Sequence, residues 1–247
     1  MTEGRNLEQH STATQEKVPE VNPEVDIESV LERGEITSAE TLKGYFPIKT
    51  VDIKDDGKGI FRPEGFTYER LEKKENLRTE LELLASSVNE VLGFKLVPPI
   101  VFREIEGQKG TLQTFVNNGE IADNYGGNWP EVVAESEILK AAVFDFLINA
   151  QDRHEGNFLV DPDSEKIWLI DHDDLMFLVS GFPSHILVEA NKRGLTELSE
   201  EIIRSIQRLY DKVNYLLPMS TDTRIQKILL EIKARARKLV EDRKITV

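Results

Sequence analysis

The chain has 247 residues, a length that suits one domain with a sizeable core or two small lobes around a cleft. Its 45 acidic and 31 basic side chains give a formal net charge of -14, which argues against general binding to nucleic-acid phosphates. The absence of cysteine excludes disulfides, thiolate nucleophiles and cysteine-ligated zinc, and it favours a cytoplasmic location. Because no apolar run is long enough for a membrane span, we expect no integral membrane association.

The first part of the chain changes character near residue 46. Residues 1–28 are polar and acidic with almost no large apolar side chains, so they predict a flexible acidic tail. Residues 46–53 and 60–63 then have the composition of strands, and the glycine-containing turn between them indicates a β-hairpin.

A helix and two more strands follow the hairpin. Residues 75–92 repeat leucine and valine at helical spacing and end on Gly93, a common residue at helix C-termini. Residues 96–103 and 110–116 are strand-like and flank a turn. These elements predict a small lobe of strands around one helix, within about residues 29–116.

The second half predicts a larger and mainly helical lobe. Residues 117–130 are rich in glycine and asparagine and indicate a connecting linker rather than a regular element. Apolar residues at helical spacing from Ile138 to Ala150 predict a buried helix that runs into a polar loop, and the chain from Thr196 onward is mostly helical. This lobe covers about residues 131–247.

A second hairpin brings two oxygen-bearing side chains together. Residues 158–160 and 167–170 flank a turn of aspartate, proline and serine, and antiparallel pairing places Asn157 opposite Ile170 or Asp171. An amide oxygen and a carboxylate then converge at one end of the hairpin. Hard oxygen ligands, few in number, suit Mg²⁺ held jointly with phosphate better than zinc.

Asp152 and His154 lie just upstream, in the loop that leaves the buried helix. Either side chain could orient or deprotonate an attacking hydroxyl, which is the help that phosphoryl transfer needs besides metal and a cation for the phosphates. Taken singly, these residues also fit a solvated helix end. The ordered set Asp-Arg-His-x-x-Asn, hairpin and apolar-Ile-Asp is much more specific.

Residues 152–157 (DRHEGN) and 169–172 (LIDH) resemble the catalytic and metal-binding loops of the phosphatidylinositol 3-/4-kinase-like superfamily, in its compact microbial branch. Three earlier segments, residues 60–63, 78–80 and 110–113, are similar to its phosphate-contacting strand, its helix glutamate and the Gly-Thr-Leu-Gln before its adenine-binding linker. The resemblance implies an α+β, two-lobed protein-kinase-like fold within residues 29–247.

The resemblance also implies roles for single residues. It gives catalytic roles to Asp152 and His154 and metal ligation to Asn157 and Asp171. It implies that the nucleotide, ATP, contacts a set of small-lobe residues, namely Arg62, Glu80, Gln113, Thr114, Phe115 and Val116.

Two positions depart from the family pattern. Arg62 stands where the family has lysine before proline, and because a planar guanidinium cannot replace an ammonium contact without rearrangement, Lys58 is an alternative phosphate contact. Arg62 could also be an ordinary strand arginine paired with a nearby carboxylate. Asp173 follows His172 where the family usually has glycine, so it could hold a second cation or face solvent.

We therefore predict an ATP- and Mg²⁺-dependent phosphotransferase that moves the γ-phosphoryl group to a hydroxyl acceptor. A protein serine or threonine is favoured over a lipid, because the acidic chain lacks the basic or lipidated surface that helps a membrane enzyme. Two alternatives remain open. The chain could be a pseudokinase that serves as a nucleotide-binding or interaction module, or it could transfer another group such as AMP.

Overall fold

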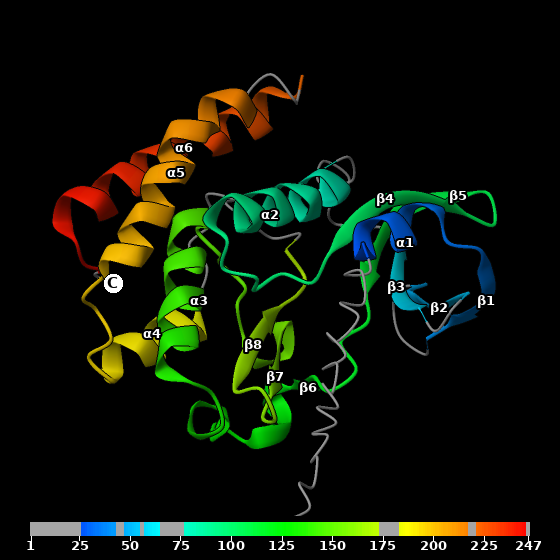
Figure 1. Cartoon of the computed structure of the whole chain (residues 1–247), viewed down its shortest axis with the longest axis horizontal. Coiled ribbons are helices and arrows are strands. Elements are labelled where there is room, and N and C mark those ends of the chain that lie inside the picture. The colour runs from blue at the N-terminus through cyan, green and yellow to red at the C-terminus, as the bar shows by residue number, and fades with distance from the viewer. Residues whose placement is uncertain are drawn as a thin grey trace, which may run out of the picture.

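The computed structural model describes residues 26–42, 47–54, 57–64, 77–172, 183–216 and 221–245. They form an α+β fold, in which an antiparallel sheet lies on one side of the molecule and a group of helices on the other (Figure 1). Most of the predicted tail, the tip of the first hairpin and Asp173 lie outside the described residues.

The sheet of the small lobe has the strand order β1-β2-β3-β5-β4, with every neighbouring pair antiparallel. Its strands are β1 (Ile36–Thr41), β2 (Lys49–Ile53), β3 (Gly57–Pro63), β4 (Ile100–Ile105) and β5 (Gln108–Thr114). The predicted first hairpin is confirmed as β2–β3, with Thr50 opposite Ile60. The later pair is confirmed as β4–β5, but β4 begins only at Ile100. Prolines 98 and 99 lack the N–H that a ladder needs.

The small lobe has its own apolar core, which α1 (Ile27–Arg33) covers. The buried members are Leu31, Val51, Ile53, Phe61, Val101, Ile105 and Leu112. Asp26 caps α1 by accepting a hydrogen bond from the Ser29 amide at 3.2 Å. Residues 27 and 28, which the sequence assigned to the tail, are therefore helical. Asp26 caps the helix, and Leu31 is buried in the core of the small lobe.

Helix α2 (Arg78–Leu92) is confirmed, and it ends at Gly93 in the left-handed conformation, with φ 72°. Its apolar face joins the core of the helical lobe rather than that of the sheet, which differs from the predicted small lobe built around this helix. At its C-terminal end, Arg208 of α5 (Glu200–Leu216) donates a 3.0 Å hydrogen bond to the Leu92 carbonyl. Helix α2 is thus anchored to the larger lobe.

The larger lobe contains α3 (Glu135–Ile148), α4 (His185–Lys192), α5 and α6 (Thr223–Asp242), together with a sheet of order β6-β7-β8. Its strands are β6 (Glu120–Ile121), β7 (Phe158–Asp161) and β8 (Lys166–Leu169). Helices α5 and α6 lie side by side, and the apolar face of α6 is buried (Figure 1). No helix in the described part of the chain is long and apolar enough to cross a bilayer.

The linker predicted at residues 117–130 is partly regular. It contains β6 and two short 3₁₀ helices, Ala122–Tyr125 and Trp129–Glu131. Trp129 is buried and packs edge-on against Phe158, with 5.0 Å between the ring centroids. The prediction of a plain loop was wrong here because strand β6 is only two residues long and pairs with β7, a contact distant in sequence.

Gly110 sits where β5 passes β3 most closely, beside the strand that carries Arg62. A Cβ atom at this position would lie 2.2 Å from the Arg62 carbonyl oxygen. We therefore expect Gly110→Ala to lower the free energy of unfolding by about 3 kcal/mol, because the two strands would have to separate. Urea denaturation measures this change.

Gly107→Ala is the matched control, because its Cβ would meet no atom within 4 Å and only the positive φ of 76° opposes it. We expect a loss of about 1 kcal/mol there. An equal loss at both positions would contradict a steric role for Gly110.

Candidate active site

The β7–β8 hairpin confirms the predicted pairing and decides its register. Phe158 lies opposite Leu169, and the Ile170 amide donates a 3.2 Å hydrogen bond to the Asn157 carbonyl, which places Asn157 opposite Ile170. Asp171 follows with φ 58°, a left-handed conformation that turns the chain out of the ladder. The structure therefore brings Asn157 and the backbone before Asp171 together.

Arg153 is the buried connection between these two segments. Its Nε lies 3.2 Å from Oδ1 of Asp145 on α3, and its side chain is almost fully enclosed. One terminal nitrogen donates to the Asn157 carbonyl and to the Ile170 carbonyl, each at 2.6 Å. Ser184 completes the group by donating to Asp145 at 2.7 Å. A single guanidinium thus fixes the spacing of the two segments that carry the predicted metal ligands.

Sequence reasoning missed Asp145 and gave Arg153 no role of its own. The available signal was a carboxylate inside the apolar helix that precedes the loop, in the run VFDFLI. A buried carboxylate needs a partner, and the arginine eight residues later could have been proposed for it.

Asp152 and His154 stand at the solvent-facing side of the same loop. Their side chains are 58% and 51% exposed, and 4.0 Å separates His154 Nε2 from Asp152 Oδ2. His154 Nδ1 accepts a hydrogen bond from the Gly156 amide at 3.0 Å, so a neutral imidazole carries its proton on Nε2. The structure thus brings the two predicted proton-handling groups together.

Asn157 faces Asp152 through its amide nitrogen. Nδ2 donates to the Asp152 carbonyl at 2.8 Å and approaches Asp152 Oδ2 at 3.5 Å. This assignment leaves Oδ1 of Asn157 for a cation. The Asp171 carboxylate is about one-third exposed and forms an ion pair with Arg78 at 3.4 Å. One amide oxygen and one carboxylate fit a hard cation that takes its other ligands from phosphate and water.

Within the part of the chain that the structure describes, no group of three histidine, cysteine or acidic side chains is arranged to hold a metal ion. A cage built from protein groups alone is therefore absent from those residues.

Glu82 and His172 form a buried pair next to this site. Burial by itself would raise the pKa of Glu82, but the His172 hydrogen bonds and the charges of His172 and Arg62 hold that pKa at about 2. Burial lowers the pKa of His172. At neutral pH Glu82 is therefore a carboxylate that accepts hydrogen bonds from the His172 ring and from the His172 backbone amide.

Arg62 reaches toward the same region from β3. It donates to Oε1 of Gln113 on β5 at 3.1 Å, and Glu82 acts on it electrostatically. Arg62 Nε and Gln113 Nε2 are buried and have no hydrogen-bond partner among the described residues. Two buried donors of this pair thus lack an acceptor among the described residues.

Glu80 is not brought together with Arg62. It lies on the exposed face of α2, where its charge acts on Arg224 of α6. The carboxylate on the Arg62 side is Glu82, two residues later. Helical phase could have identified Glu82 in the sequence, because this residue lies among Leu81, Leu84 and Ala85 on the buried face of α2.

The remaining predicted nucleotide contacts follow the end of β5. Thr114 and Phe115 donate their amides to the carbonyls of Pro99 and Lys58, both at 2.9 Å. Lys58 is exposed, with its Nζ 4.7 Å above the Phe115 ring. Val116 is half-buried, and its amide has no hydrogen bond to any residue described.

The chain was compared with known proteins. No family model matches it. Two crystal structures of the Golgi casein kinase, one of them with Mn/ADP bound, superimpose with TM-scores of 0.53 at 14% and 15% sequence identity. Both cover 87% of this chain, and this chain covers 73% and 74% of them. The fold is protein-kinase-like.

A curated sequence is also similar. Phosphatidylinositol 4-kinase gamma 4 from Oryza sativa subsp. japonica is 36% identical over 92 residues, which are 34% of this chain. The chain spans only 16% of that protein.

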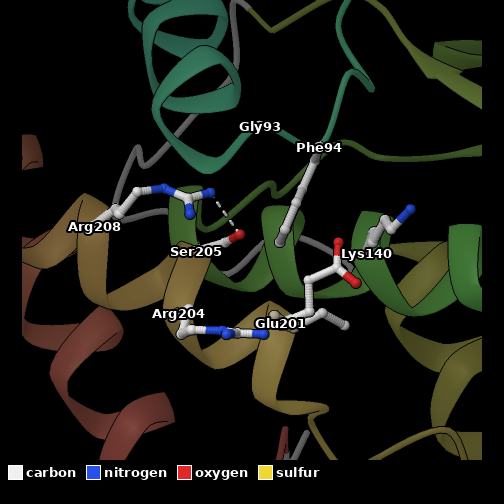
Figure 2. A pocket seen from close by; sticks show the side chains of 8 residues that line it. Gly93, Phe94, Lys140, Glu201, Arg204, Ser205 and Arg208 are labelled. Carbon is white, nitrogen blue, oxygen red and sulfur yellow. Dashed lines mark hydrogen bonds between the residues drawn. The ribbon is translucent and has the colours of Figure 1, made fainter.

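A cavity of about 340 Å³ lies elsewhere in this kinase-like fold (Figure 2). It is lined by Gly93 and Phe94 after α2, by Lys140 of α3 and by polar side chains of α5. None of the predicted site residues lines it. The candidate active site is therefore argued from side-chain chemistry and hairpin geometry rather than from this cavity.

The Arg153 connection is testable through stability. Arg153→Gln leaves the buried Asp145 carboxylate without its cation, and we expect a loss of about 3–5 kcal/mol in the free energy of unfolding. Arg237→Gln removes an exposed arginine that pairs with Glu241, and we expect a loss of at most about 1 kcal/mol. Chemical denaturation of both variants measures the difference, and equal losses would contradict the role of Arg153.

Proposed function

We propose that this protein is an ATP- and Mg²⁺-dependent phosphotransferase that moves the γ-phosphoryl group of ATP to a hydroxyl acceptor. The observation that carries the proposal is the Arg153 bridge, which holds Asn157 and the segment of Asp171 side by side in a protein-kinase-like fold. The Mn/ADP complex of the Golgi casein kinase supports nucleotide and divalent cation as ligands of this fold.

The nucleotide phosphates are assigned to Arg62, with Gln113 beside it. Their buried donors, which have no acceptor among the described residues, support an anionic ligand at this position. We assign adenine to the segment from Thr114 to Val116, because the Val116 amide, which bonds to no described residue, can donate to a ring nitrogen. Lys58 lies outside, over Phe115, so it is the weaker candidate for a phosphate contact.

Asn157 and Asp171 are the residues assigned to Mg²⁺. The cation, when bound, would offset the negative charge that accumulates on the phosphates during transfer. The chain contributes the spacing of the two ligands through Arg153 and the orientation of the Asn157 amide through Asp152.

Asp152 is assigned to the acceptor hydroxyl. Its carboxylate is exposed and can take the proton as the hydroxyl attacks. His154 is the second candidate for this proton, but its Nδ1 accepts from Gly156, so the neutral ring presents a donor toward Asp152. We therefore assign His154 to holding the Asp152 carboxylate in place.

For the acceptor we propose a protein serine or threonine, in a cytoplasmic setting. The net charge of -14 and the lack of cysteine support this choice over a membrane lipid. The local similarity to a phosphatidylinositol 4-kinase makes lipid the acceptor to test next.

The second candidate function is a pseudokinase, and Arg62 in place of lysine favours it. Only the first function produces transfer, whereas a pseudokinase can bind ATP without turnover or act as an interaction module without nucleotide. Mass spectrometry of a peptide mixture incubated with ATP distinguishes an added phosphoryl group from an added AMP and from no product.

Asp171→Asn tests the cation site. We expect it to weaken Mg²⁺-dependent ATP binding by about 100-fold, because a neutral amide is a poor ligand for a hard cation. Asp163→Asn, in the exposed turn of the same hairpin, is the matched control and leaves binding unchanged. Calorimetry with ATP in the presence of Mg²⁺ measures both, and a normal Asp171→Asn variant would refute the proposed site.

Arg62→Met and Lys58→Met show which of these two side chains contacts the nucleotide phosphates. We expect Arg62→Met to weaken ATP binding by about tenfold or more, since it removes charge-assisted hydrogen bonds inside the cleft, and Lys58→Met to change it by less than about threefold. The same calorimetric titration measures both variants. The opposite ranking would assign the phosphates to Lys58.

A further inference from the structure

Helix α2 contacts two successive residues after β8. Arg78 forms the 3.4 Å ion pair with Asp171. Four residues later, Glu82 Oε1 accepts the His172 amide at 3.0 Å, and its Oε2 lies 3.1 Å from His172 Nδ1. Residues four apart share one helix face, so a single face of α2 contacts both members of the dipeptide.

The second contact is sealed from solvent. The side chains of Glu82 and His172 are 1% and 0% exposed. The imidazole also packs edge-on against Phe144 of α3, with 6.0 Å between the ring centroids, and it lies within the fields of Arg153 and Asp145. A hydrogen bond in such surroundings is stronger than in water and holds its partners in one geometry.

The backbone needs such a contact. Asp171 has φ 58°, a conformation that side-chain-bearing residues adopt only where their surroundings hold them. The carbonyl of Ile170 is held by Arg153, and the amide of His172 is held by Glu82. The peptide groups before and after Asp171 are thus each held by a hydrogen bond to a side chain.

We propose that His172 is a positioning residue for Asp171. Its bonds to Glu82 on α2 make cation binding depend on the position of that helix. The inference rests on the proposed function in one respect, that Asp171 is a cation ligand. Because α2 is anchored to the helical lobe through Arg208, the coupling fixes Asp171 relative to Asn157.

Three variants test the coupling. His172→Leu fills the space but removes the side-chain donor to Glu82. His172→Asn keeps a side-chain N–H close to the place of Nδ1 and fills less of the space. His185→Leu makes the same change at an exposed histidine, at the start of α4, and is the control.

The functional measurement is ATP binding by calorimetry, with Mg²⁺ and with EDTA. We expect His172→Leu to weaken binding in Mg²⁺ by about 10- to 100-fold, as is typical when a group that orients a metal ligand is lost. Binding in EDTA stays unchanged, because the phosphate and adenine contacts are intact. His172→Asn retains most of the Mg²⁺-dependent affinity, and His185→Leu retains all of it.

A packing role alone gives another result. If His172 only fills space, leucine preserves binding better than asparagine, or both variants weaken binding equally in Mg²⁺ and in EDTA. Either outcome overturns the proposal.

Hydrogen exchange of the peptide covering residues 169–172 gives a second measurement that needs no ligand. We expect faster exchange there in His172→Leu than in the wild type, and wild-type exchange in residues 158–161. Wild-type protein that binds no Mg²⁺ and ATP would refute the proposed function, whereas unchanged exchange at residues 169–172 would refute the coupling by itself.

Discussion

The buried ion pair between Arg153 and Asp145 is the interaction on which the candidate active site depends. A buried arginine needs partners for its charge and its donors, and here the Asp145 carboxylate accepts from Nε while two backbone carbonyls accept from one terminal nitrogen. The two carbonyls belong to the segments that carry the proposed cation ligands. The same contacts that make burial of the charge tolerable therefore set the geometry of the site.

Helix α2 has a second structural role. Its apolar residues belong to the larger core, while its polar residues Arg78 and Glu82 reach the dipeptide after β8. The sheet has a separate, smaller core under α1. Hence Arg62 on β3, the proposed phosphate contact, and Asp171 after β8, the proposed cation ligand, belong to different packed units. Glu82 is linked to both sides, by the charge of Arg62 and by its hydrogen bonds to His172.

Much of this arrangement could be predicted from local pattern. Periodicity identified α2 and α3, and turn composition identified both hairpins. The turn predicted that Asn157 lies opposite Ile170 or Asp171, because antiparallel pairing follows from the turn, and the structure then decided for Ile170. The resemblance pointed to Glu80, whereas helical phase decides which side chain faces inward, and that side chain is Glu82. Strand β6 could not be predicted, because its pairing with β7 is not local.

The sequence alone determined the local elements and the chemical inventory of the site: the loop from Asp152 to Asn157, the following Asp171, and a chain without thiols and with excess negative charge. Tertiary structure decided which groups meet. It paired Arg153 with Asp145 and joined Glu82 to His172 across 90 residues of chain. It left Glu80 exposed on α2, where its charge acts on Arg224. The reason is physical: secondary structure follows from neighbouring residues, but burial of a charge is settled only when distant segments supply its partner.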